Sequence, residues 1–135
     1  MKKHLLKLYL STIILSCIAT FIWVHILELS RDNIPRCYMP YFTEFILACI
    51  AFLMSLSFFT IFFNLYKNFR TNRVLRFLSF YFFLFIDIII IIAMYYNYMS
   101  HFLYGLSVII PLFIMITYSY ISFSKFLQNH TNYLE

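Results

Sequence analysis

The stretch that most constrains this chain is residues 77–99, FLSFYFFLFIDIIIIIAMYYNYM, which is almost entirely apolar. At the 1.5 Å rise per residue of an α-helix, about 20 such residues cross the ~30 Å hydrocarbon layer of a membrane. An acidic residue, Asp87, interrupts the stretch near its middle. Because a charged side chain at that depth costs at least ~2.5 kcal/mol, Asp87 requires a stabilising partner, either in this protein or in a neighbouring one.

Three further apolar runs give the chain the pattern of an all-α membrane protein. We predict a single integral membrane domain over residues 1–135, with transmembrane helices at 8–27, 41–66, 77–97 and 102–123. The composition is 64% hydrophobic and 11% charged, with a mean hydropathy of +0.86, whereas a soluble domain is about half apolar and about a quarter charged. The first run is longer than the ~7–15 residues of a signal peptide and no A-x-A-like site follows it. The short connections predict an up-down bundle of four helices.

The positions of the basic residues predict the orientation. With the N-terminus inside, Arg31 and Arg36 lie outside. The inner face then holds eight cations, namely Lys2, Lys3, Lys7, Lys67, Arg70, Arg73, Arg76 and Lys125. This asymmetry follows the positive-inside rule, so both termini are expected inside. The segment KNFRTNRVLR at 67–76 has four bases and no acid, and we expect it to contact anionic lipid. The net charge of +5 therefore reflects membrane orientation, and we expect no nucleic acid partner.

Asp87 is the centre of a predicted intramembrane polar site. It lies ten residues after Phe77, about 15 Å into the membrane, and Pro111 lies at similar depth on the next span. Pro111 has no N–H, so the carbonyl of Ser107 loses its helical partner. A neutral Asp87 could donate a hydrogen bond to that carbonyl or to the Ser107 hydroxyl. Asp87 is thus interpreted as a structural anchor or a partner contact, with a proton carrier as the alternative.

Small residues recur on one face of each of the first two spans, where they would let helix backbones approach closely. These predicted packing residues are Thr12, Ser16 and Thr20 on the first span and Ala48, Ala51 and Ser55 on the second. We expect the two faces to meet each other or a partner. The alternative is that the hydroxyl groups bond only to their own helices.

The sequence favours a protein without enzymatic activity. It contains no phosphate-binding loop, no nucleophile elbow and no zinc-binding H-E-x-x-H motif. Short loops leave no room for a soluble active site. His25, His101 and Glu44 are interpreted as residues of the membrane interface, and we expect no metal and no cofactor.

Two classes of function remain. The first is a helper that acts through helix contacts with another membrane protein or as a homo-oligomer. It would be either an immunity or exclusion protein or a small subunit of a complex such as a respiratory complex. The layout is similar to that of some immunity proteins against pore-forming bacteriocins, in topology alone. An excess of Phe and Tyr over Gly and Pro indicates an A+T-rich gene, which fits a bacterial or a mitochondrial inner membrane. The alternative class is an ion or proton channel or transporter that uses Asp87.

Overall fold

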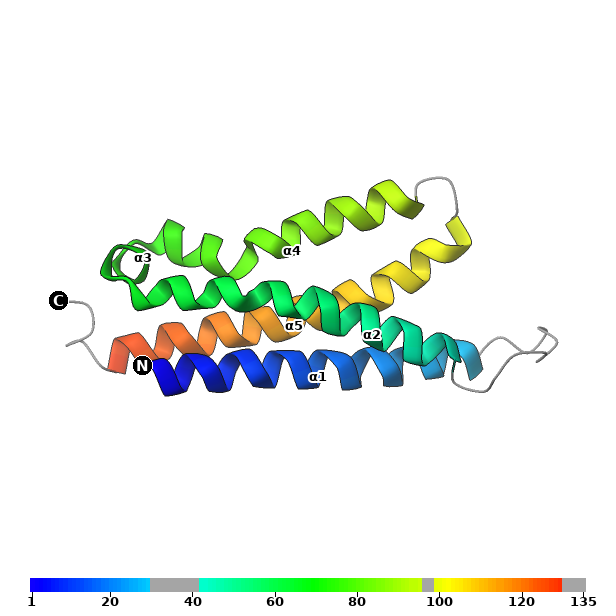
Figure 1. Ribbon diagram of the computed structural model, residues 1–135, viewed down its shortest axis with the longest axis horizontal. Helices are drawn as coiled ribbons and strands as arrows, with labels where there is room; N and C mark the ends of the chain where they lie inside the picture. Colours follow the sequence, from blue (N-terminus) through cyan, green and yellow to red (C-terminus); the bar gives the residue numbers. More distant parts are fainter. Residues whose placement is uncertain (30–41, 96–98, 130–135) are drawn as a thin grey trace.

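The chain forms a bundle of long helices. The computed structural model describes residues 1–29, 42–95 and 99–129, and the side chains of 1–29, 42–93 and 104–129. The elements are α1 (Lys2–Leu29), α2 (Phe42–Leu56), the 3₁₀ helix η1 (Ser57–Leu65), α3 (Lys67–Thr71), α4 (Arg73–Tyr95) and α5 (Met99–Asn129). Figure 1 shows the rods side by side, with successive rods running in opposite directions. The start of α1, the short α3 and the end of α5 share one end, which we term the basic end; the opposite end is the loop end.

Four helical stretches are long and apolar enough to cross a membrane, and they indicate an integral membrane protein. They are Lys2–Leu29, Phe42–Leu65, Arg73–Ala93 and Tyr104–Asn129. Only between 28% and 44% of the residues in each apolar window are buried inside the bundle. The remaining apolar side chains face outwards, as hydrocarbon would allow and water would not.

The helices extend beyond the apolar runs from which the spans were predicted. The first begins at Lys2 rather than at residue 8, and the last ends at Asn129 rather than at residue 123. Lysine and glutamine are good helix formers, so the helix continues into polar residues once the apolar run has begun it. The basic segment at 67–76 is mostly helical. Asn72 ends α3, and its side-chain oxygen accepts hydrogen bonds from Val74 N and Leu75 N, which caps the start of α4.

The second span changes helix type part-way. At Leu56, where α2 ends, the carbonyl accepts a hydrogen bond of 3.2 Å from the Tyr9 hydroxyl of α1. The following nine residues form η1, which is long for a 3₁₀ helix. At three residues per turn, Phe58, Ile61 and Asn64 lie on one face, and all three are buried.

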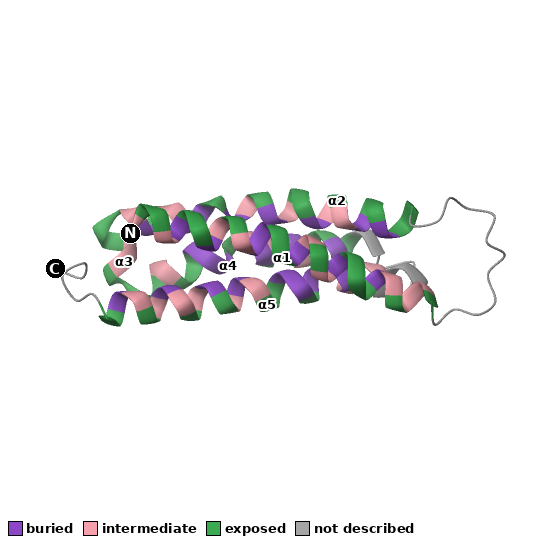
Figure 2. Ribbon diagram, turned by 90° about the horizontal axis from the view of Figure 1, so that it is seen from below, coloured by how far each residue is buried: buried purple, intermediate pink, exposed green. Residues whose placement is uncertain are grey.

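The core is concentrated in the half of the bundle nearest the basic end. One cluster of eleven buried side chains joins α1, η1, α4 and α5 there: Leu5, Leu8, Phe58, Ile61, Phe80, Tyr81, Leu84, Leu112, Ile116, Phe123 and Leu127. The ring of Phe80 lies 5.6 Å from that of Phe58 and 5.8 Å from that of Phe123, between centroids. Figure 2 shows the buried residues as a stripe along the inward faces, with exposed residues on the outer faces.

The described side chains at the loop end form a smaller core cluster. It consists of Val24, Leu47, Ala51 and Val108, which come from α1, α2 and α5. No residue among the described side chains of α4 belongs to it. Figure 1 shows the reason, since α4 diverges from α2 towards the loop end. Among the described elements, α4 packs mainly against α5, η1 and α3.

Candidate functional site

The candidate site is built around Asp87 on α4. The buried side chains Phe80, Leu84, Asp87 and Ile91 recur every three or four residues, so they form one helical stripe that faces the bundle. Asp87 is 8% exposed. Helix periodicity places Asp87 in this stripe, although every other member of the stripe is apolar.

Asp87 makes no hydrogen bond or ion pair within the part of the chain that the structure describes, and its Oδ2 atom is buried without a partner. This differs from most polar groups between the helices, which are paired. The paired groups are Thr12 Oγ1 with Ser119 Oγ at 2.8 Å, Tyr81 Oη with Thr117 Oγ1 at 3.0 Å, and Thr60 Oγ1 with the Ser79 carbonyl at 2.8 Å. Other buried polar atoms also have no described partner, among them Oγ1 of Thr20 and Oγ of Ser124. A buried carboxyl group without a partner is more costly than a buried hydroxyl group, which makes Asp87 the candidate site.

The two residues predicted to accompany Asp87 lie on the neighbouring helix α5. Ser107 is 1% exposed and Pro111 is buried inside the helix. A hydrogen bond between Asp87 and Ser107 is not among the described contacts, and the pairing expected from the sequence stays a prediction. The helix α5 continues through Pro111.

The six predicted packing residues are placed mainly inside the bundle. Thr12, Ser16 and Thr20 of α1 and Ala51 and Ser55 of α2 are buried, and Ala48 is partly buried. The two helices α1 and α2 pack extensively against each other. The hydroxyl groups differ in their partners. Thr12 bonds across to α5, whereas Ser16 and Ser55 bond to the carbonyls of Ile13 and Phe52 in their own helices. Oγ1 of Thr20 is buried without a partner among the described residues.

Sequence reasoning missed a second polar site at the loop end. Glu44 is 5% exposed, and its Oε1 lies 3.3 Å from Nδ1 of His25. The Tyr104 hydroxyl donates to Oε1 of Glu28. These contacts tie α1 to α2 and to α5. A signal was present in the sequence, since His25 and Glu28 are three residues apart and therefore share a face of α1.

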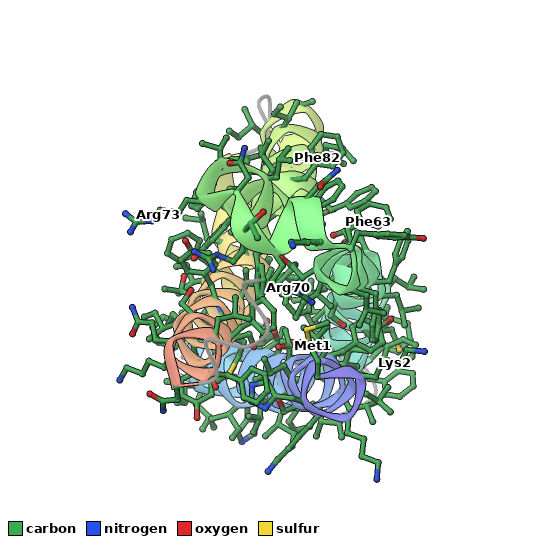
Figure 3. All side chains as sticks on the ribbon, turned by 90° about the vertical axis from the view of Figure 1, so that its left-hand side faces the viewer. Met1, Lys2, Phe63, Arg70, Arg73 and Phe82 are labelled. Atoms are coloured by element: carbon green, nitrogen blue, oxygen red, sulfur yellow. The ribbon has the colours of Figure 1, made fainter. Side chains whose placement is uncertain are left out.

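The four bases predicted to face the membrane surface divide into two pairs. Lys67 and Arg73 are exposed, whereas Arg70 and Arg76 are partly buried. Figure 3 views the basic end and shows Arg70 over the middle of the bundle, near Met1, while Arg73 points away from it. Within the described ranges, no group of three or more His, Cys, Asp or Glu side chains could hold a metal ion.

Comparisons with known proteins give no family assignment. No family model, curated protein or solved structure matches this chain. Its function must therefore be argued from the site itself.

Proposed function

We propose that this chain is a small, non-enzymatic integral membrane protein that acts through helix contacts with another membrane protein. The observation that carries the proposal is the Asp87 carboxyl group, buried in the middle of an apolar span with no partner for Oδ2 among the described residues. Polar groups in the hydrocarbon layer must be satisfied by protein. A donor from a partner's transmembrane helix, such as a basic or amide side chain, would satisfy Asp87.

The packing around Asp87 supports a partner on this part of α4. Ile91 is buried but belongs to neither described core cluster, whereas Ile88 packs against the cluster nearest the basic end. Towards the loop end α4 diverges from α2 (Figure 1), and the described part of the loop-end core contains no α4 residue. A helix of a partner protein, or of a second copy, would pack against α4 in this half of the bundle.

The charge pattern favours a partner with a hydrogen-bond donor. The described cations all lie towards the basic end, and none lies at the depth of Asp87. A buried acid in a membrane pairs with a base or with another donor. No described residue supplies one to Oδ2 of Asp87, which favours a donor from a partner protein.

The proposal is tested by substituting Asp87 and sizing the protein after gentle solubilisation of its native membrane. We expect the wild-type protein in a particle larger than the monomer. The D87L variant, which keeps the size and removes the polar group, should run as a smaller particle, and D87N should retain part of the complex through its amide. Loss of a donor–carboxylate contact of ~1–2 kcal/mol corresponds to roughly 5–30-fold weaker association.

The matched control is I89V, which changes an apolar side chain two residues away on the exposed face of the same helix, where Ile89 is 65% exposed. It should leave the particle size unchanged. A wild-type protein that is monomeric in its own membrane, or a D87L protein with an unaltered particle, would disprove the proposal.

A channel or transporter that uses Asp87 is the second candidate. The observation that favours it is the number of buried polar side chains in the described bundle, which include Thr12, Ser16, Thr20, Ser107 and Ser119. Reconstitution in liposomes separates the two functions. Proton or ion flux that is lost in D87N at normal expression supports the channel, whereas an absence of flux in the wild-type protein supports the helper.

The helper has two forms, an immunity or exclusion protein and a subunit of a larger complex, in a bacterial or mitochondrial inner membrane. A stable particle of several different chains supports the subunit. The immunity protein is supported if the wild-type chain protects cells against a pore-forming toxin and substitution of Asp87 removes this protection.

A further inference from the structure

The charges of the described chain are separated along the bundle. The basic end holds the eight cations named above. The described acids lie elsewhere: Glu28 and Glu44 are near the loop end and Asp87 is in the middle of α4. The contact between Nδ1 of His25 and Oε1 of Glu44 is also at the loop end. The cations of the basic end therefore have no carboxylate partner in the described part of the chain.

Two of these cations are held inwards by the turn between α3 and α4. Nη1 of Arg76 donates to the carbonyl of Arg70 at 3.4 Å, so Arg76 folds back over α3. Nη1 of Arg70 lies 3.4 Å from Sδ of Met1, which places Arg70 over the middle of the bundle end (Figure 3). Asn72, between the two arginines, fixes this turn by capping α4.

The inward position leaves guanidinium donors without acceptors. Nε of Arg70 and Nε of Arg76 are both buried and neither has a hydrogen-bond partner among the described residues. The sulfur atom that Arg70 does contact is only a weak acceptor. Each guanidinium group has five N–H donors in a planar fork, which matches the oxygen atoms of a phosphate.

We propose that Arg70 and Arg76 form a specific binding site for the phosphate group of an anionic phospholipid. An anion between them would supply acceptors for the orphaned Nε–H groups and compensate two charges that the described chain leaves uncompensated. Arg70 lies within four residues of the start of α4, and Arg76 lies within four residues of Phe77, at the edge of an apolar span. Lipid phosphates are concentrated at this edge, so a lipid headgroup is favoured over a soluble anion. This proposal does not depend on the function proposed for Asp87.

The test measures binding of short-chain phosphatidylglycerol to the purified full-length protein in a neutral detergent, with zwitterionic phosphatidylcholine as the comparison. At an ionic strength of about 0.5 M, exposed charges are screened within ~4 Å, so a built site dominates. We expect phosphatidylglycerol to bind at least ~10-fold more tightly than phosphatidylcholine. Equal binding of the two lipids by the wild-type protein would overturn the proposal without any variant.

Two double variants of equal charge locate the site. R70Q/R76Q should lose the preference for phosphatidylglycerol, whereas K67Q/R73Q, which removes two exposed cations, should keep it within about threefold because exposed charges are screened. Equal losses in both would mean diffuse attraction and would refute the site. If R70Q/R76Q does not fold, R70K/R76K replaces it; a weakened preference supports the planar fork as the ligand, and an unchanged one contradicts it.

Two further measurements exclude other anions. Inorganic phosphate at the same concentration as phosphatidylglycerol should fail to displace the bound lipid. Effective displacement would assign the site to a soluble anion instead. The sequence also contains Glu135, beyond the described residues. The E135Q variant should bind lipid as the wild type does, and tighter binding would identify Glu135 as the occupant and overturn the lipid assignment.

Discussion

At the scale of single residues, the polar side chains inside this bundle act as specific links between helices. Thr12 of α1 and Ser119 of α5 are each 1% exposed, and their hydroxyl oxygens are 2.8 Å apart. In an apolar solvent the hydrophobic effect does not hold helices together, so such hydrogen bonds and close packing do so.

We expect T12V to weaken the contact between α1 and α5. A double-mutant cycle of T12V and S119A should give a coupling free energy of about 0.6 kcal/mol, the average for hydrogen bonds between membrane helices. Unfolding in mixed detergent micelles measures it. The control is S11A, because the Ser11 hydroxyl bonds to the Leu8 carbonyl in its own helix. A coupling of zero, or an S11A effect as large as that of T12V, would contradict this role.

At the scale of elements, the 3₁₀ helix η1 determines which side of the second span faces the core. In an α-helix Asn64 would be turned about 120° away from Phe58, since each residue advances ~100°. In η1 the two share a face, so Asn64 is fully buried and donates to the Ile61 carbonyl and to Ser79 Oγ of α4.

The N64A variant tests this register. We expect it to destabilise the fold by about 1–3 kcal/mol, because the buried Ser79 loses a partner and a gap opens beside it. The measurement is again unfolding in mixed micelles, with N68A on the exposed face of α3 as the neutral control. An N64A protein as stable as the wild type would indicate that Asn64 faces outwards and that the span is α-helical throughout.

At the scale of the whole molecule, the distribution of charge sets the orientation that we predict. The start of α1, α3 and the end of α5 lie together at the basic end (Figure 1). Whichever membrane holds the protein, these segments must therefore be on one side of it if the four long helices span it.

Cysteine labelling in sealed vesicles tests this orientation. Cys17 and Cys49 are replaced by serine, which leaves Cys37 of the predicted outer loop as the natural thiol. A membrane-impermeant maleimide should label Cys37 from one side. In a second chain that also lacks Cys37, a cysteine is placed at exposed Asn68 or Lys125. The maleimide should label this cysteine from the other side. Labelling of Cys37 and of position 68 from the same side would contradict the four-span arrangement.

The sequence was sufficient for the features that depend on solvent. Long apolar runs with charges at their ends predicted four helices, and the structure contains four that are long and apolar enough to cross a membrane. The same reasoning identified Asp87, since a lone acid within an apolar run stands out without any structure.

Only the tertiary structure decided which faces of these helices meet. Almost every position of each span is apolar, so the sequence offers little of the polar–apolar periodicity that would distinguish an inner from an outer face. The burial of Asn64 depends on a change of helix type, that of Glu44 depends on how closely α2 lies against α1, and the inward position of Arg70 and Arg76 depends on the turn at Asn72. Hydropathy records how much a residue favours hydrocarbon, whereas these positions depend on contacts between segments distant in the sequence.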